Sequence, residues 1–427
     1  MQYMKIQLRL HLLLHVICLI TFDYPLSMFL THIYLILHYV LSYNNFFLTA
    51  THYTTVFLNT LLIILKYILK IILPNLHIAP SSFFCYNRHK SENRDRRISQ
   101  TMKVTIIIPN YNGKHFMEPC LQSLSEQTCR DFKVLVVDNA SSDGSLEYMS
   151  EHYPDIEVIS LKKNYGFSKA VNVGIEHSTT PYVILLNNDT TVDTHYVEEM
   201  IKAIEKSPRI FSVSSKMIQM YHPELIDSAG DLYTLMGWGV CRGTGRPVSN
   251  YTKADQIFTA CAGAAIYRRN AFSKIGLFDE NHFAYLEDID VGYRAKIYGY
   301  KNTYCPTALV YHVGSGTSGS KYNSFKVKLS ARNNIYLNYK NMPFLQLVLN
   351  FIPLFLGCVV KYLFFMRKGF GKDYACGIKE GFSHAREQKK VAFKLRHLPN
   401  YILIEFELIL HTLSYARDWF TRKLFKK

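Results

Sequence analysis

Between residue 103 and about residue 190, short apolar runs alternate with stretches that have the spacing of amphipathic helices. The apolar runs are VTIIIP (104–109), FKVLVVD (132–138), IEVISL (156–161) and YVILLN (182–187). An amphipathic run around 116–127 separates the first two. Short apolar runs without strict alternation are typical of strands that are buried on both faces. The order strand, helix, strand therefore predicts an α/β fold with a mostly parallel sheet and helices on both faces.

The residues that end these strands are the first place to look for a binding site, because ligands of such sheets bind beyond the C-terminal ends of the strands. Three strand ends carry polar side chains: Pro109, Asn110, Tyr111 and Asn112 after the first, Asp138 after the second, and Asn187, Asn188 and Asp189 after the fourth. Turn chemistry alone also explains Asn, Asp, Ser and Gly in a loop. Several such loops on one edge favour a site.

The sequence excludes the common glycine-turn modes of nucleotide binding. No GxGxxG follows the first strand, and no GxxxxGK[ST] loop occurs anywhere in the chain. These absences count against a nicotinamide dehydrogenase and against a P-loop enzyme. A divalent cation can instead bridge a protein carboxylate and the oxygens of a diphosphate, and Asp189 offers such a carboxylate. Alternatively, Asp189 caps the helix predicted for 194–206, although Asp193 and Thr194 are better placed for that.

Charge is distributed unevenly along the chain. Residues 1–101 contain 9 Lys or Arg and 3 Asp or Glu. The corresponding numbers are 21 and 24 in residues 102–325, and 19 and 6 in residues 326–427. The slightly acidic middle region argues against a nucleic-acid partner. The last region, at +13, combines positive charge with long apolar runs, which favours an anionic membrane surface as a partner.

Cysteine usage indicates a reducing compartment. The chain has 9 cysteines, an odd number, and none forms a CxxC pair. The pattern predicts neither a disulfide framework nor a zinc site.

The N-terminal region, 1–101, is apolar and ends in the basic stretch NRHKSENRDRR (87–97). Its most apolar run, 56–73, is long enough to span a bilayer, but Lys66 and Lys70 would each cost about 2.5–3.5 kcal/mol near the bilayer centre. An interfacial helix is an equal alternative. Met102 stands directly before the first strand, so the region is either an anchor or an over-extended gene model. No convincing signal-peptide cleavage site is evident.

The C-terminal region, 326–427, contains a strongly apolar run at 342–369 that is interrupted by Asn350, Pro353 and Lys361. This run fits a kinked membrane span, a re-entrant hairpin or an interfacial helix, and a buried core helix is the plain alternative. The flanking basic residues and a second apolar run at 401–420 favour membrane contact. The chain is thus divided into 1–101, 102–325 and a helical, membrane-associating region at 326–427.

Five ordered motifs resemble those of a family 2 glycosyltransferase of the GT-A fold: VTIIIPNYNG, VLVVDNASSDGS, KNYGFSKAVNVGI, ILLNNDT and YLEDIDVGYR. The resemblance covers about 102–326 and is nearest to the rhamnosyltransferase-like enzymes that build bacterial cell-surface and cell-wall polysaccharides. It implies a Rossmann-like nucleotide-binding sheet, a UDP-, dTDP- or GDP-sugar donor, and Mg²⁺ or Mn²⁺. It also implies inversion at the sugar carbon, with which a single base and one displacement are consistent.

The resemblance assigns roles to the strand-end residues. Asp138 would contact the base or ribose of the nucleotide. Asn187 and Asp189 occupy the metal-binding DxD position, and Asn187 stands where the pattern has its first Asp. One carboxylate ligand therefore remains.

A second group of carboxylates lies in the stretch EDID, 287–290. Transfer of a sugar to an alcohol needs a base near the acceptor hydroxyl, which contributes about 10²–10⁴-fold. By resemblance Asp288 is the expected base, and Glu287 is its rival. Taken alone, an acidic first turn of a helix complements the helix dipole, and Asp290 fits that role. Arg294, one turn further, is expected to pair with one of these carboxylates.

The remaining residues that the resemblance places at the site come from three other segments. His312 would lie near the metal and the diphosphate, and Gly263 would line the sugar and acceptor cleft. The donor-pocket loop would contain Asn164, Gly166, Phe167 and Asn172. A structural histidine, a buried strand and a tight turn are the respective alternatives.

These observations predict an inverting glycosyltransferase at the cytoplasmic face of the cell membrane, peripheral or with membrane-inserted helices. It would move a sugar from a nucleotide-diphosphate sugar to a hydroxyl of a lipid-linked saccharide or polysaccharide. One alternative is a sugar nucleotidyltransferase, whose glycine-rich basic loop is absent. Another is a catalytically silent sugar-binding or scaffold protein of the GT-A fold, which the missing first Asp of the DxD position favours.

Overall fold

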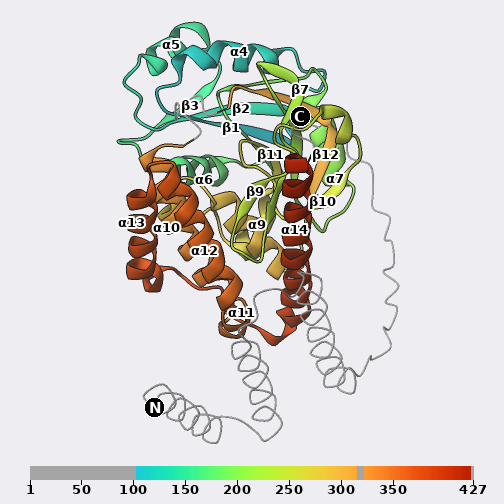
Figure 1. The fold of residues 1–427 in the computed structure, drawn as a ribbon. Helices are drawn as coiled ribbons and strands as arrows, with labels where there is room; N and C mark the ends of the chain where they lie inside the picture. The colour runs from blue at the N-terminus through green and yellow to red at the C-terminus, as the bar shows by residue number, and fades with distance from the viewer. Residues whose placement is uncertain (1–101, 315–321, 425–427) are drawn as a thin grey trace, which may run out of the picture. The chain divides into compact units, whose positions relative to one another are not determined.

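The computed structural model describes residues 102–314 and 322–424, which lie within one compact unit, Arg96–Lys427. The expectations for residues 1–101, including the apolar run 56–73, lie outside the described residues. A mixed ten-stranded sheet forms the centre of the described part, with the main strand order β10-β12-β6-β11-β4-β1-β2-β3 (Figure 1).

The four strands predicted from the sequence are present and form one half of the sheet. They are β1 (Val104–Asn110), β2 (Phe132–Asp138), β3 (Glu157–Ser160) and β4 (Tyr182–Leu186). The pairs β1–β2, β1–β4 and β2–β3 are all parallel. The expected parallel sheet is therefore confirmed for this half.

The second half of the sheet contains antiparallel strands. Its members are β6 (Ile210–Gln219), β10 (Asp255–Ile257), β11 (Ala264–Arg268) and β12 (Lys301–His312). Strand β11 runs antiparallel to both β4 and β6, whereas β12 runs parallel to β6. Most strands of the main path thus share one direction, and β10 and β11 run against it.

Two further strands, β5 (Thr190–Val192) and β7 (His222–Ser228), pair with β12 and β6, respectively. A separate hairpin joins β8 (Asp231–Tyr233) to β9 (Gly239–Cys241).

Helices cover both faces of the sheet, as the alternation of side chains along β1 shows. Ile106 and Ile108 belong to a core that includes residues of α4 (Lys114–Ser125) and α7 (Tyr196–Glu205). Ile107, between them, belongs to the opposite core with residues of α6 (Phe167–His177) and α9 (Glu287–Ile297). The other helices of this part are α5 (Ser145–His152) and the short α8 (Phe272–Ile275). The predicted layering is confirmed.

The C-terminal region is helical, as expected. It consists of α10 (Ser324–Asn341), α11 (Phe344–Leu349), α12 (Phe351–Arg367), α13 (Gly371–His384) and α14 (Leu398–Leu424). Asn350 separates α11 from α12, at one of the interruptions seen in the sequence. Among the helices in the described ranges, none combines the length and the apolar character needed to cross a membrane.

The C-terminal helices are attached to the sheet domain by specific contacts. Lys296 Nζ of α9 donates to Glu407 Oε1 of α14 at 3.0 Å, and Asn400 Nδ2 donates to the Ile297 carbonyl at 2.9 Å. The Trp238 indole donates to the carbonyl of Gly357 at 3.1 Å, which joins the tip of the β8–β9 hairpin to α12. A Cβ at Gly357 would overlap the Met236 carbonyl, so only glycine permits this approach.

Candidate functional site

Three strand ends meet at one edge of the sheet, as the sequence predicted. The Asn110 amide, from the end of β1, donates to Asp138 Oδ1 at 2.8 Å, at the end of β2. Asn188, just after β4, donates from Nδ2 to Asn110 Oδ1 at 2.7 Å. All three side chains are buried. These residues, together with Asn187 and Asp189, are called the rim below.

The loop after β2 folds back over Asp138. Ser141 donates to this carboxylate from its backbone nitrogen at 2.9 Å and from its hydroxyl at 2.6 Å. Asn112 connects the loops after β1 and β2, because its nitrogen donates to Ser141 Oγ at 2.9 Å and its Oδ1 accepts from the Ser142 nitrogen at 2.8 Å. Tyr111 projects from the same loop and is 38% exposed, which leaves its ring accessible to a ligand.

His312 lies next to Asp189 of the rim. His312 Nε2, at the end of β12, lies 3.3 Å from Asp189 Oδ1, and its Nδ1 lies 2.8 Å from Asp227 Oδ2. Burial by itself would lower the pKa of His312, but its hydrogen bonds to the two carboxylates raise that pKa to about 10. The backbone also holds the pair together, since the Val313 nitrogen donates to the Asp189 carbonyl at 3.1 Å.

The donor set around Asp189 fits a divalent cation. A metal-binding histidine usually donates its second ring nitrogen to a carboxylate, which fixes the tautomer and the orientation of the ring. His312 has this arrangement at Nδ1, which faces Asp227, while Nε2 faces the Asp189 carboxylate and would have to release its proton to bind an ion. The side-chain oxygen of Asn187, next to Asp189 in the chain, is a further hard ligand. The residues present therefore suit the ion that the sequence predicted.

Glu287 and Asp288 form the first turn of α9, after a backbone segment with positive φ angles. Glu287 is buried, and its Oε2 has no hydrogen-bond partner among the described residues. Burial, followed by the charges of Asp288 and Asp290, raises the pKa of Glu287 to about 8. Burial also raises the pKa of Asp288. A raised pKa suits a general base that works near neutral pH.

A third carboxylate that was not predicted lies beside Asp288. Ligand atoms of Asp231, Cys261 and Asp288 all lie within 4.8 Å of one another. Burial and then the charge of Asp288 raise the pKa of Asp231 well above its usual value. The two carboxyls thus favour holding one proton between them. The same three residues are also a possible cation-binding group, made of two carboxylates and a thiol.

The segment 261–263 connects the acidic pair to the rim. The Cys261 thiol lies within 4.8 Å of a carboxylate oxygen of Asp288. The Gly263 carbonyl accepts from the Asn187 nitrogen at 2.8 Å. A Cβ at Gly263 would lie 3.1 Å from Asn187 Nδ2, a tighter contact than a side chain normally makes. One short segment therefore places the expected base and the expected metal ligands next to each other.

The loop expected to line the donor pocket packs beside the rim. Asn139, directly after Asp138, donates from Nδ2 to the Gly166 carbonyl at 3.0 Å. Asn164 Oδ1 accepts from the Gly166 nitrogen at 2.9 Å, and Phe167 begins α6.

The Asn172 amide is buried and joins α6 to the backbone of Phe278 through hydrogen bonds of 2.8 and 3.0 Å. This contact of Asn172 is structural.

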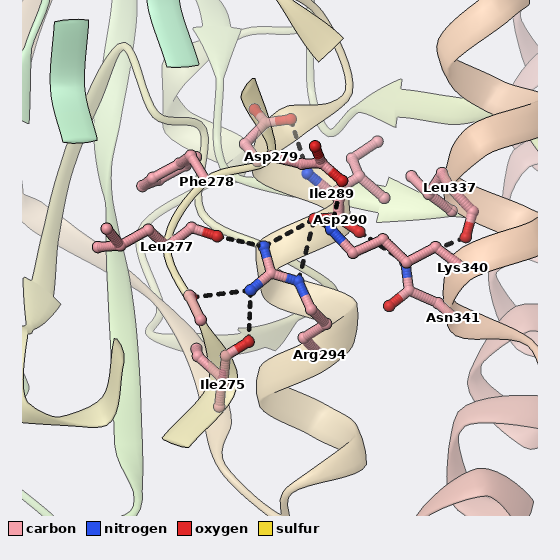
Figure 2. Close-up of polar contacts among 12 residues, drawn as sticks. Ile275, Leu277, Phe278, Asp279, Ile289, Asp290, Arg294, Leu337, Lys340 and Asn341 are labelled. Atoms are coloured by element: carbon pink, nitrogen blue, oxygen red, sulfur yellow. Dashed lines mark hydrogen bonds and ion pairs between the residues drawn. The ribbon is translucent and has the colours of Figure 1, made fainter. Parts of the chain in front are cut away.

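The last carboxylate of the EDID stretch has a different role. Asp290 is fully buried and accepts hydrogen bonds from Arg294 at 2.7 Å, Lys340 at 3.0 Å and Asn341 at 2.7 Å (Figure 2). Burial would raise the pKa of Asp290, but the two cations hold it far below its usual range. The expected pairing of Arg294 with one of these carboxylates is confirmed. Asp290 does more than complement a helix dipole, since it joins α9 to α10 (Figure 2).

Sequence reasoning missed Asp227 and Asp231, which stand four residues apart in IDSAGD, 226–231. This stretch runs from the end of β7 into β8 of the separate hairpin, where strands and helices do not alternate regularly. The available signal was two carboxylates four residues apart with Gly230 between them, whose φ of 88° favours glycine.

A comparison with known protein families decides the assignment. Residues 105–276 match the model described as glycosyl transferase family 2. This part of the chain belongs to glycosyltransferase family 2. The matched segment of this glycosyltransferase contains Asp138 and Asp189 and ends before Glu287 and His312.

Two bacterial relatives are similar to this chain over about half of its length. An N-acetylglucosaminyl-diphospho-decaprenol L-rhamnosyltransferase from Mycobacterium tuberculosis is 26% identical over 237 residues, which are 50% of this chain and 77% of the relative. A poly-beta-1,6-N-acetyl-D-glucosamine synthase from Staphylococcus epidermidis is 22% identical over 248 residues, which are 57% of this chain and 58% of the relative. The resemblance seen in the motifs is confirmed at the level of family and enzyme class.

A solved structure is also similar. It is a mannosyltransferase from Pyrobaculum calidifontis in complex with GDP-Man and Mn²⁺, with a TM-score of 0.42 and 17% identity. The similarity covers 75% of this chain and 84% of the other.

Proposed function

We propose that the glycosyltransferase inverts the anomeric carbon while it moves a sugar from a nucleoside-diphosphate sugar to a hydroxyl of a lipid-linked saccharide or polysaccharide. The observation that carries this proposal is the convergence of Asp189 and His312, 3.3 Å apart, on the rim that also holds Asp138. Segment 261–263 connects this group to Asp288, since Gly263 accepts a hydrogen bond from Asn187 and the Cys261 thiol lies within 4.8 Å of the Asp288 carboxylate. A diphosphate site and a base thus lie side by side.

In the proposed reaction, each residue of the site has a distinct task. Asp138 and the loop around Tyr111 bind the nucleoside, and Asp189, His312 and Asn187 would hold Mg²⁺ or Mn²⁺. A bound ion would supply positive charge next to the departing diphosphate. Asp288 takes the proton of the acceptor hydroxyl, whose oxygen forms a bond to the anomeric carbon on the side opposite the leaving nucleoside diphosphate. A single displacement of this kind inverts the configuration.

The test is a donor panel. The purified protein is incubated with UDP-, dTDP- and GDP-sugars and Mn²⁺ or Mg²⁺, and release of nucleoside diphosphate is compared with that of Asp189→Ala. Release is expected from one donor class, and the variant is expected to need about 10–100-fold more metal for the same rate, because a ligand has been removed. Asp193→Ala, a nearby carboxylate outside the site, is the matched control and should behave like the unaltered protein.

Two results would contradict the proposal. No release from any donor, with membrane extract supplied as acceptor, would favour the silent sugar-binding or scaffold alternative. Release of pyrophosphate from a nucleoside triphosphate and a sugar phosphate would favour the nucleotidyltransferase alternative.

A membrane-bound acceptor is supported by the surface of α11 and α12. Large apolar side chains on these helices are exposed, among them Phe344 (78%), Leu345 (66%), Phe351 (65%), Ile352 (57%) and Phe355 (58%). Such a continuous apolar surface is typical of an interface with a partner or a membrane. The +13 charge of residues 326–427 adds attraction to anionic lipid. We therefore place the enzyme at the cytoplasmic face of the membrane, in interfacial contact through α11 and α12.

Vesicle sedimentation tests this contact. Phe351 and Phe355 stack with ring centroids 6.3 Å apart and both are exposed, so changing them leaves the core intact. The double change Phe351→Asp, Phe355→Asp is expected to weaken binding to anionic vesicles by at least about tenfold, because each buried aromatic ring contributes about 1.5–3 kcal/mol. Tyr221→Asp, at an exposed aromatic residue of the β6–β7 turn, is the control. Equal sedimentation of both variants would contradict contact through α12.

A further inference from the structure

The short segment 283–286, directly before the acidic pair, has an unusual backbone. Phe283, Tyr285 and Leu286 have φ angles of 62°, 71° and 68°. Side chains other than glycine rarely adopt this left-handed conformation, since Cβ then crowds the carbonyl oxygen. In the described part of the chain, only Asn112 and Ala140 share it among non-glycine residues. The segment needs neighbours that hold it in place.

One buried side chain of the C-terminal region makes the required contacts. Asn333 of α10 has no exposed surface, and its Nδ2 donates to the carbonyls of His282 at 2.9 Å, Ala284 at 2.8 Å and Tyr285 at 2.8 Å. Its Oδ1 accepts from Arg332 Nε at 3.1 Å, which fixes the orientation of the amide. The amide nitrogen carries two donor hydrogens, so two of the three carbonyls share one of them, whereas a carboxylate in its place would carry none.

The same segment also touches the loop expected to bind the donor. A Cβ at Gly166 would lie 2.5 Å from the Phe283 carbonyl and 2.6 Å from its ring, so the two backbones are in close contact. The Ser168 nitrogen, in the first turn of α6, donates to the Phe283 carbonyl at 3.2 Å. At its C-terminal end the segment continues directly into Glu287 and Asp288 at the start of α9. It therefore lies between the donor loop and the expected base.

We propose that Asn333 is a positioning residue of the transfer reaction, which holds segment 283–286 so that Asp288 stays in place relative to the donor loop. The inference rests on the proposed function of this site. It goes beyond that function by assigning a role in catalysis to α10, a helix of the C-terminal region. Within the described residues, the hydrogen bonds of the Asn333 side chain join it to the carbonyls of residues 282, 284 and 285 and to the side chain of Arg332.

The test compares Asn333→Asp with Asn338→Asp. Both asparagines are buried on α10, but Asn338 accepts a hydrogen bond from the Tyr233 hydroxyl at 2.7 Å, which an aspartate can also accept. In Asn333→Asp, kcat for donor turnover is expected to fall by about 10²-fold, as for a misplaced catalytic group. Affinity for free nucleoside diphosphate should stay within about threefold, because the residues assigned to the nucleoside and the diphosphate lie at the ends of β1, β2, β4 and β12 and not in segment 283–286. Asn338→Asp should keep kcat within about threefold of the unaltered protein.

Hydrogen exchange of the backbone amides of residues 283–287 is the second readout, and it does not depend on activity. Exchange there is expected to become at least about tenfold faster in Asn333→Asp and to stay unchanged in Asn338→Asp. If Asn333→Asp does not fold, Asn333→Ser, which keeps one donor hydrogen, replaces it with the same expectations. Retained kcat, equal losses in both variants, or unchanged exchange at 283–287 would overturn the proposal. If the unaltered protein turned over no donor, the proposed function would be contradicted instead. Hydrogen exchange at residues 283–287 would then still test whether Asn333 holds this segment.

Discussion

Replacing Asp288 with asparagine is expected to lower kcat for sugar transfer by about 10²–10⁴-fold, the usual contribution of a general base. The amide keeps the shape of the carboxylate and can still accept the hydrogen bond from the Ile289 nitrogen, which is 2.8 Å long. What it cannot do is take a proton from the acceptor hydroxyl. Transfer is measured as nucleoside diphosphate released in the presence of acceptor, at saturating donor and metal.

Two further variants make this result specific. Asp155→Asn changes an exposed carboxylate and should keep full activity. Glu287→Gln tests the rival base, whose pKa of about 8 leaves it largely protonated at pH 7. A larger loss in Glu287→Gln than in Asp288→Asn would reverse the assignment. If Asp288→Asn and Glu287→Gln both retained transfer, neither carboxylate would be the base, and the assignment of the base to the EDID stretch would be wrong.

Replacing Asp290 with alanine is expected to destabilise the protein by about 3–5 kcal/mol, because it leaves the buried guanidinium of Arg294 without its anion. Arg294 keeps its bonds to the carbonyls of residues 275–277, and Lys340 keeps Asp279 at 2.6 Å, so both remain buried in the variant (Figure 2). The measurement is the shift of the urea unfolding midpoint, followed by circular dichroism.

The surface pair of Arg242 and Asp255 provides the matched control for this prediction. Its oxygen and nitrogen lie 2.8 Å apart, but the Asp255 side chain is 55% exposed. Exposed ion pairs contribute about 0–1 kcal/mol, so Asp255→Ala should shift the midpoint little. Similar shifts in the two variants would mean that the buried network around Asp290 contributes no more than a surface pair.

Local sequence patterns were sufficient for the half of the sheet whose strand ends form the rim. Strands β1 to β4 are continuous apolar runs, and their polar ends, Asn110, Asp138 and Asn188, meet as parallel geometry requires. The order β12-β6-β11-β4 was not predictable in the same way, because it depends on pairings between strands far apart in the chain. The antiparallel direction of β11 gives no local signal in AAIYR.

The site was predictable to the extent that its residues belong to local motifs. Asp189, Glu287 and Asp288 stand in such motifs, whereas Asp227 and Asp231 become neighbours of His312 and Asp288 only through folding. Asn333 is a further example, since nothing in SARNNIYL distinguishes it from the adjacent Asn334. Its contacts lie 48 to 51 residues away in the sequence.

The contacts of α10 with residues 102–325 restrict how chimeric proteins can be built from this chain. A chimera that kept residues 102–325 and received the tail of another enzyme would lose Asn333, Lys340 and Asn341 together. The incoming helix would have to replace both the amide that holds segment 283–286 and the cation that neutralises Asp290. A junction after Asn341, where α10 ends, would retain these contacts and leave α11 onward as the exchangeable part.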